Sequence, residues 1–437
     1  MGTTIVHSVL LFDGNTTHQD ATIAFEAESG IIRSVTVGTK LQATPDASVI
    51  DGKGCTLLPG FIDSHIHCDA PGVLDGGEES GISQAALRCG ITTVCDMHSD
   101  PVAVKRWRLR VANEREQALQ VGGKVSMPDL KSALYAATVS HGYPKSLLLG
   151  ENPSDELKAT INSWPSVTED TASEYVKNSK ENGADYIKLF QEDCKCFAVP
   201  TGCVPIPTIT LQRAVTAAAH AEGLLVLAHA NSVESSELVL DAGVDGLTHT
   251  FVDQYPTTQI VQKYKETNAF LIPTLTALST LTGEAQDFRD EFAKAAERKR
   301  LVDPKTLELM RKSVSWSDHG VKFEYAVESV RVLRAQGIDI LAGTDSMPGL
   351  NGTALGPSLW MELAMYHRLC AMSTLEVLRS TTSVPARRFG FDDRGVVEAG
   401  KRADLVLVRG DVVRDLQCLW EGDGILKVWR QGIEATL

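Results

Sequence analysis

Two histidines, His65 and His67, could bind a metal ion together. On a β-strand, residues at positions i and i+2 face the same side, so both imidazoles can reach one ion. Pro59 and Gly60 lie just upstream, where a loop passes into the strand. The chain has 11 histidines, and the pair alone is therefore a weak signal whose value depends on further ligands elsewhere.

The elements that would position this pair recur through the middle of the chain. Apolar, strand-like runs alternate there with helix-like stretches. The runs span 61–67, 92–98, 132–139, 185–190, 224–230, 245–250, 269–275 and 339–345, and the candidate helices include 168–182, 210–222, 233–242 and 321–336. Thr168 is a plausible cap for the first of these helices. Eight strands with intervening helices predict an α/β fold, a (β/α)8 TIM barrel over residues 58–389.

Both ends of the chain have a different texture, with short apolar, β-branched runs and turns. Residues 1–57 are too few for a stable core of their own, and residues 390–437 resemble them in pattern. We therefore predict one small β-sandwich domain formed by both termini. Two long segments, about 98–131 and 276–320, predict extra helices or lid loops over the barrel.

In such barrels the reactive groups lie at the carboxyl ends of the strands. Each polar residue there has a structural explanation when taken alone: a hydrogen-bonded histidine, an aspartate that caps a helix, or a lysine that extends to solvent. Together they lie near the ends of five different strands and predict a metal site. The residues are His65, His67, Lys188, His229, His249 and Asp345.

The chain resembles the amidohydrolase superfamily, and within it the metal-dependent hydrolases with a carboxylated lysine, in the prolidase-like and ochratoxinase-like branch. The resemblance rests on the 59–67 stretch, on Gly343-Thr344-Asp345, and on residues 395–406. It extends over nearly the whole chain.

This resemblance implies two divalent metal ions, zinc before manganese or cobalt. His65, His67 and Asp345 would hold the more buried ion, and His229 and His249 the more exposed one. Lys188, carboxylated by CO2, would bridge them. An ammonium cannot bind a metal, but an amine buried in an apolar strand loses its proton more readily and can add CO2.

The implied activity is the hydrolysis of an amide C–N bond in a small molecule, such as an N-acyl amino acid, a dipeptide or a mycotoxin-like aryl amide. Asp345 and His249 would be catalytic, with Asp345 moving a proton from water to the leaving group. The alternatives are a mononuclear deaminase or cyclic-amidine hydrolase, a lactone or carbamate hydrolase, and a barrel without activity that acts as a scaffold. The sequence His229-Ala230-Asn231-Ser232 lacks the His-x-x-Glu pattern typical of the deaminases.

His141, Tyr143 and Asn231 are the candidates for substrate contact. The first two lie after the third run, where a turn is the alternative explanation, and Asn231 stands where many prolidase-like relatives have a second histidine. His98, at the end of the second run, is a weaker candidate. No arginine clamp for a substrate carboxylate stands out, although Lys195 and Arg368 could serve.

Composition excludes several classes of partner. The net charge of −14 leaves no basic surface for nucleic acid or an anionic membrane, and no run of about 18 apolar residues could span a bilayer. Without an export signal, a cytoplasmic location and free thiols are expected for the nine cysteines. We interpret Cys194, Cys196 and Cys203 as thiols in a loop rather than a disulfide or zinc site. We expect a homo-oligomer acting on a small molecule.

Overall fold

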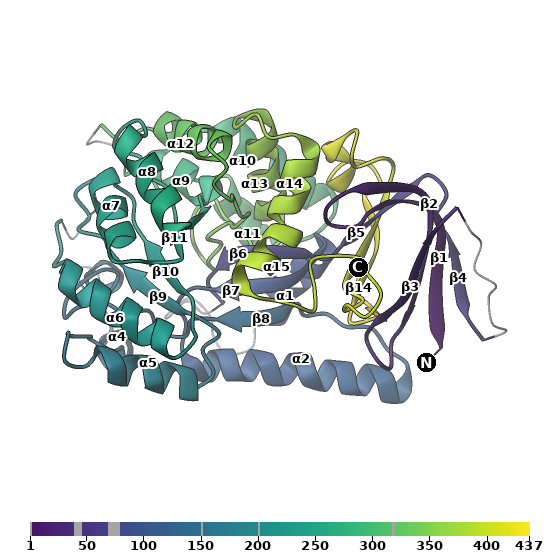
Figure 1. The fold of residues 1–437 in the computed structure, drawn as a ribbon, viewed down its shortest axis with the longest axis horizontal. Helices are drawn as coiled ribbons and strands as arrows, with labels where there is room; N and C mark the ends of the chain where they lie inside the picture. Colours follow the sequence, from purple (N-terminus) through teal and green to yellow (C-terminus); the bar gives the residue numbers. More distant parts are fainter. Residues whose placement is uncertain (1, 39–45, 69–78, 150–151, 200–201, 317–319) are drawn as a thin grey trace.

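Both ends of the chain join one eight-stranded sheet (Figure 1). The computed structural model describes residues 2–38, 46–68, 79–149, 152–199, 202–316 and 320–437. The strand order is β15-β14-β13-β5-β1-β2-β3, with β4 paired to β1. The strands are β1 (Thr3–Phe12), β2 (Thr17–Glu26), β3 (Ile32–Val37), β4 (Ser48–Asp51), β5 (Cys55–Pro59), β13 (Leu405–Arg409), β14 (Ile425–Arg430) and β15 (Ile433–Glu434).

This sheet forms because β5 lies between an N-terminal and a C-terminal strand. It pairs in parallel with β1 and antiparallel with β13, where Leu405 lies opposite Pro59. Phe25 and Trp429, one from each end of the chain, meet in its core with ring centroids 5.3 Å apart. The predicted meeting of the two termini is therefore observed, but as one hydrogen-bonded sheet instead of the two sheets of a sandwich.

The middle of the chain is mixed α/β, as predicted, and contains two parallel sheets. One has the order β6-β7-β8 and the other β12-β11-β10-β9. Nearly every residue in these strands is buried, which is typical of parallel strands covered on both faces. The strands are β6 (Phe61–Ile66), β7 (Ile91–Asp96), β8 (Asp129–Ser132), β9 (Ile187–Phe190), β10 (Val226–His229), β11 (Gly246–Thr248) and β12 (Phe270–Ile272).

Backbone bridges connect these two sheets at two places. Ala137 bridges to Leu189 of β9, and the segment 340–346 bridges through Ile340 to β12 and through Ser346 to β6. The predicted eighth strand, 339–345, is therefore a bridging segment and not a regular strand. The predicted third run is also shifted, since β8 ends at Ser132 and only Ala137 pairs further on.

Helices follow or precede the parallel strands. Side-chain oxygens cap several of their first turns; Thr208, Ser232 and Thr257, for example, each accept a hydrogen bond from a backbone N–H of α6, α7 and α8. The helices are α1 (Glu79–Arg88), α2 (Pro101–Val121), α3 (Lys145–Leu149), α4 (Asp155–Ser163), α5 (Ala172–Glu181), α6 (Ile209–Ala221), α7 (Val233–Asp241), α8 (Thr258–Thr267), α9 (Leu275–Thr282), α10 (Gln286–Arg298), α11 (Pro304–Met310), α12 (Phe323–Ala335), α13 (Pro357–Arg368), α14 (Thr374–Ser380), α15 (Ser383–Phe389) and the 3-10 helix η1 (Leu416–Leu419).

The expected helices and inserted segments are present, with adjusted bounds. The first predicted helix begins at Ala172, and Thr168 bonds to Thr171 instead of capping it. The expected insertions contain α2 and β8 in one case and α9, α10 and α11 in the other. Within the part of the chain that the structure describes, no helix is both long and apolar enough to cross a membrane.

Candidate metal centre

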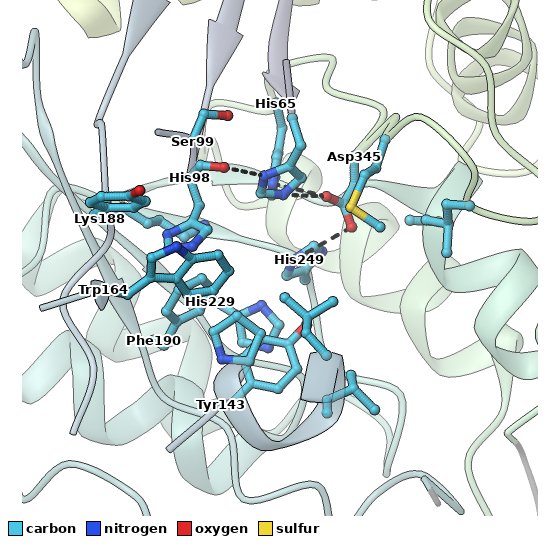
Figure 2. A pocket seen from close by; sticks show the side chains of 18 of the residues that line it. His65, His98, Ser99, Tyr143, Trp164, Lys188, Phe190, His229, His249 and Asp345 are labelled. Atoms are coloured by element: carbon cyan, nitrogen blue, oxygen red, sulfur yellow. Dashed lines mark hydrogen bonds and ion pairs between the residues drawn. The ribbon is translucent and has the colours of Figure 1, made fainter. Parts of the chain in front are cut away.

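Three imidazoles and one carboxylate converge where the parallel strands end. Nε2 of His65 and Nε2 of His67 each lie 3.1 Å from Oδ1 of Asp345, and Nε2 of His249 lies 4.0 Å from its Oδ2. Figure 2 shows the rings of His65 and His249 facing the Asp345 carboxylate. His65, His249 and Asp345 each offer one ligand atom, and these atoms lie within 4.8 Å of one another. Residues from three distant parts of the sequence thus meet at one point.

His229 and Lys188 lie beside this cluster. The ring centroid of His229, the last residue of β10, is 4.5 Å from that of His249. Lys188, within β9, is only 1% exposed, and its Nζ donates to Oγ1 of Thr248. All six predicted ligands therefore line one cavity.

Burial sets the protonation states of these groups. It lowers the pKa of His65 to about 3, and that of His249 well below its usual value. It also lowers the pKa of Lys188 to about 7, although Asp345 opposes this. Burial raises the pKa of Asp345, but its contacts with His65, His67 and His249 outweigh burial and hold it well below its usual value. For His67, burial lowers the pKa, but the hydrogen bond and the charge of Asp345 outweigh burial and raise it above the usual value. The cluster is thus an ionised carboxylate beside two neutral imidazoles, those of His65 and His249.

Second partners orient two of the rings. Nδ1 of His67 donates to the carbonyl oxygen of His98 at 3.1 Å, and Nδ1 of His249 is hydrogen-bonded to Oγ1 of Thr274 at 2.6 Å. Both contacts turn Nε2 toward Asp345. A ring nitrogen fixed in this way is typical of metal-binding histidines.

The backbone around the cluster is strained. His249, Thr274 and Asp345 have φ values of 70°, 52° and 54°, a left-handed conformation that is unfavourable for side chains other than glycine. Glu362, fully buried, accepts hydrogen bonds from the backbone N–H groups of Leu275 and Thr276. It holds the start of α9 directly after Thr274. Such strain persists where the surroundings enforce it, often at functional sites.

Asp63, a buried aspartate, is hydrogen-bonded both to the segment that contains His65 and to the segment that contains Asp345. It accepts from the backbone N–H of His65 at 3.3 Å and from that of Thr344 at 3.1 Å, and from the Thr344 hydroxyl at 2.9 Å. Burial raises its pKa to about 8. Asp63 therefore fixes the spacing between His65 and Asp345.

Glu192 was not predicted, yet it contacts a ligand. Its Oε2 lies 3.2 Å from Nε2 of His229 and accepts from Nδ2 of Asn231 at 3.0 Å. Asn231 is buried and does not line the cavity, so the structure does not bring it to the substrate side. The sequence signal for Glu192 was only its place two residues beyond β9, in an irregular segment.

The cavity above the cluster has a volume of about 450 Å³. Tyr143 lines it and stacks on His229 at 4.7 Å between centroids, whereas His141 is exposed and does not line it. His98 lines the cavity as well. Besides the six predicted ligands, the lining consists of His98, Ser99, Asp100, Tyr135, Tyr143, Pro144, Leu147, Leu148, Thr160, Trp164, Phe190, Ala277, Leu281, Trp316, Met347 and Leu350.

The cysteines lie apart from this chemistry. Cys194, Cys196 and Cys203 carry free thiols, as do the six others, so no disulfide forms in this loop. Burial raises the pKa of Cys196 to about 12. The absence of a zinc site in this loop stays a prediction.

The donor set fits divalent metal ions. Neutral imidazoles and a carboxylate are ligands of zinc, and Nε2 of His65, although 3.1 Å from the Asp345 carboxylate, is buried without a hydrogen-bond partner. Unpaired polar atoms in protein interiors are rare and call for an explanation. A cation within the cluster would supply it, by drawing the Nε2 atoms and the carboxylate oxygens to one centre.

Comparisons with known proteins point the same way. The model of the amidohydrolase family matches residues 56–433. An allantoinase of Saccharomyces cerevisiae is 33% identical over 133 residues, which are 26% of this chain and 29% of the allantoinase. The chain thus matches less than a third of that relative's length.

Solved structures resemble the whole chain at low identity. A Xaa-Pro dipeptidase with bound methionine has a TM-score of 0.72 at 20% identity, covering 99% of both chains. Ochratoxinase of A. niger has a TM-score of 0.70 at 17% identity, covering 99% of this chain and 96% of its own. Phenylurea hydrolase B has a TM-score of 0.75 at 19% identity, covering 99% and 97%. At these identities the likeness concerns the fold.

Proposed function

Because the chain belongs to the amidohydrolase family, we propose that it hydrolyses an amide C–N bond of a small molecule at a dinuclear metal centre. The observation that carries the proposal is the convergence of His65, His67 and His249 on Asp345 at the strand ends. The names of similar structures, a dipeptidase, an ochratoxinase and a phenylurea hydrolase, support this reaction class.

In this proposal the six ligands divide between two ions, with zinc the best match for their chemistry. His65, His67 and Asp345 would hold the first, and His229 and His249 would hold the second. Lys188, carboxylated by CO2, would be a ligand shared by both. A pKa of about 7 supports this use of Lys188. At neutral pH the side chain is then an uncharged amine in a large fraction of the molecules, and this amine can add CO2.

When bound, the metal ions lower the pKa of water and polarise a carbonyl group. Asp345 takes the proton from the attacking water and passes it to the leaving nitrogen, so that a C–O bond forms as the C–N bond breaks. His249, held by Thr274, faces the same carboxylate and fixes its position.

The architecture we propose is a closed (β/α)8 barrel over residues 58–389, with a β domain formed by residues 1–57 and 390–437. The bridges at Ala137, Ile340 and Ser346 support closure. Ala137 links the segment after β8 to β9, and Ile340 and Ser346 together link one segment to the edge strands β12 and β6. A homo-oligomer stays a prediction, which size-exclusion chromatography with light scattering would test.

A mononuclear enzyme is the second candidate. His65, His249 and Asp345 form a compact ligand group without Lys188 or His229, and one ion would suffice for a deaminase or a cyclic-amidine hydrolase. The count of metal ions separates the two candidates.

The test combines metal analysis with a hydrolysis screen. Plasma mass spectrometry of the purified protein should give two ions per chain, and His229→Asn should reduce the count toward one. His220→Asn is the matched control, because His220 pairs with Asp245 in the outer part of the fold. The screen covers N-acyl amino acids, Xaa-Pro dipeptides and aryl amides. One ion would favour the mononuclear enzyme, and none would favour a scaffold.

A further inference from the structure

Beside the metal centre, the cavity has a wall of aromatic and aliphatic side chains. The ring of Trp164 meets that of His98 at 4.4 Å between centroids, and Phe190 packs against His98 at 5.4 Å (Figure 2). Aliphatic residues complete this wall, namely Leu147, Leu148, Leu281, Met347 and Leu350. A substrate group seated here exchanges water for apolar contacts.

This wall contains no cation. Among the described lining residues, Lys188 is the only lysine or arginine, and it belongs to the metal centre. Nδ1 of His98 accepts a hydrogen bond from the backbone N–H of Ala136 at 2.9 Å, so this nitrogen carries no proton and the ring is not an imidazolium. The nearest formal charge of the wall is negative, on Asp100, which accepts from the Tyr135 hydroxyl.

Basic residues that could reach inward are engaged elsewhere. Nζ of Lys145 donates to the carbonyl of Trp164 at 2.9 Å and to Oγ of Ser166 at 2.7 Å. Lys195 and Arg368, the two possible clamps for a substrate carboxylate, do not line the cavity. Lys195 pairs with Asp193, and Arg368 pairs with Glu291. Segments 69–78, 150–151, 200–201 and 317–319, outside the described residues, contain no lysine or arginine in their sequence, whereas segment 39–45, also outside them, contains Lys40.

A carboxylate in this wall would lose its hydration without gaining a partner. Unpaired buried charges are strongly unfavourable, whereas aromatic groups gain from burial against apolar walls. We propose that the enzyme selects substrates whose groups beyond the scissile amide are uncharged and aromatic or apolar, and that it rejects a free carboxylate there. This inference rests on the proposed function, and it narrows the substrate class to aryl amides ahead of dipeptides and N-acyl amino acids.

Two pairs of probes of equal shape test the selection. In the first, 4-(benzoylamino)benzamide is compared with 4-(benzoylamino)benzoate, which differ only in replacing a carboxamide by a carboxylate. In the second pair the same groups lie on the benzoyl ring. We measure kcat/KM of the metal-loaded enzyme by release of the arylamine, and dissociation constants by quenching of tryptophan fluorescence, since Trp164 and Trp316 line the cavity.

The carboxamides should be preferred by about 100-fold or more in at least one pair, the range expected for an unpaired buried charge. Equal affinities in both pairs, or tighter binding of the carboxylates, would overturn the inference. If no probe is hydrolysed, the proposed amide hydrolysis fails for this class, but the ratio of dissociation constants still decides the selection.

A variant with an added charge sharpens the test. Leu147 is partly exposed at the wall, so Leu147→Arg can place a guanidinium there without burying it. It should tighten binding of a carboxylate probe about tenfold, as expected for one charge-assisted hydrogen bond. Leu147→Gln, polar but uncharged, is the control and should not. Met347→Arg places the charge at a second position. If neither arginine variant reduces the preference for the carboxamide over the carboxylate probe, the explanation by charge is wrong.

Discussion

Charged side chains are arranged differently at the two ends of the parallel strands. Where the strands begin, each of four aspartates has basic partners. Asp129 accepts from Arg394 at 2.7 Å and Arg402 at 2.9 Å, and the other three have equivalent pairs. Those are Asp185 with Arg108 and Lys131, Asp245 with His220, and Asp339 with Arg387 and Arg388.

Where the strands end, one carboxylate is shared by three imidazoles, and no arginine lines the cavity among the described residues. Nδ1 of His65 has no hydrogen-bond partner, and Lys188 is buried beside the cluster. Paired charges at one end contribute to stability, whereas the buried cluster at the other end provides the chemistry in the proposed function. The same division is typical of barrel enzymes, with conserved stability at one end and activity at the other.

The largest expected effect is the loss of catalysis in Asp345→Asn. Removing the group that transfers the proton, which is also a proposed metal ligand, should lower kcat by at least about 100-fold, whereas the thermal stability of the metal-free protein should not fall. Asp339→Asn is the matched control, because it makes the same change in the same segment at the opposite end. Steady-state kinetics and calorimetry of both variants check this. An active Asp345→Asn enzyme, or an inactive Asp339→Asn enzyme, would break the comparison.

The next effect is the loss of stability in Asp129→Asn. Side chains of Arg394 and Arg402 are only 5% and 11% exposed, so their charges would lose a buried partner. Asp393 and Asp404 still pair with them, and we therefore expect the low end of the usual range, about 3 kcal/mol in the free energy of unfolding. Urea denaturation measures this, and metal content should remain unchanged. If Asp129→Asn loses metal but not stability, the charge pairs where the strands begin do not have the stabilising role assigned to them.

The predicted ligands could be placed from the sequence because polar residue types coincide with the ends of predicted strands. His65, His67, Lys188, His229, His249 and Asp345 were all predicted, and all line the cavity. The paired aspartates were equally visible, since the predicted runs beginning at 185, 245 and 339 each start with one. Their partners lie far away in sequence, so pairing could not be predicted.

The apolar wall of the cavity and the residues that orient the predicted ligands could not be predicted from the sequence, for a different reason. Trp164 and Trp316 lie in irregular segments, whose path depends on tertiary packing and not on periodicity. The position of His141 could not be predicted for the same reason. The turn that contains it leaves it exposed, whereas Tyr143 lines the cavity. Asn231 was assigned to substrate by position alone, and its contact with Glu192 could not be known before the fold.

A smaller effect is expected from Thr274→Val, which removes the hydroxyl bonded to His249. Loss of such an orienting partner typically weakens metal affinity by about 10- to 100-fold, and we expect the lower value because the backbone also holds the ring. Competition with a chromophoric chelator measures the affinity. Thr274→Ser retains the hydroxyl and should bind normally. Equal affinities for all three proteins would show that the ring needs no orienting bond.

The smallest effect concerns pH at the start of the strands. Burial raises the pKa of Asp129, but Arg394 and Arg402 lower it more, so the folded value lies below the usual one. Folded and unfolded forms are then both ionised above about pH 5, since the unfolded pKa is about 3.9. The difference in unfolding free energy between wild type and Asp129→Asn should stay constant from pH 8 to pH 5.

Below about pH 4 the unfolded chain binds the proton first, and the difference should shrink as pH falls toward the folded pKa. Loss of metal with falling pH affects both proteins alike and cancels in this difference. Urea denaturation across the pH range measures it. A difference that already shrinks between pH 8 and pH 5 would mean that Asp129 is not held ionised by its arginines, and the contrast between the two ends would lose its electrostatic basis.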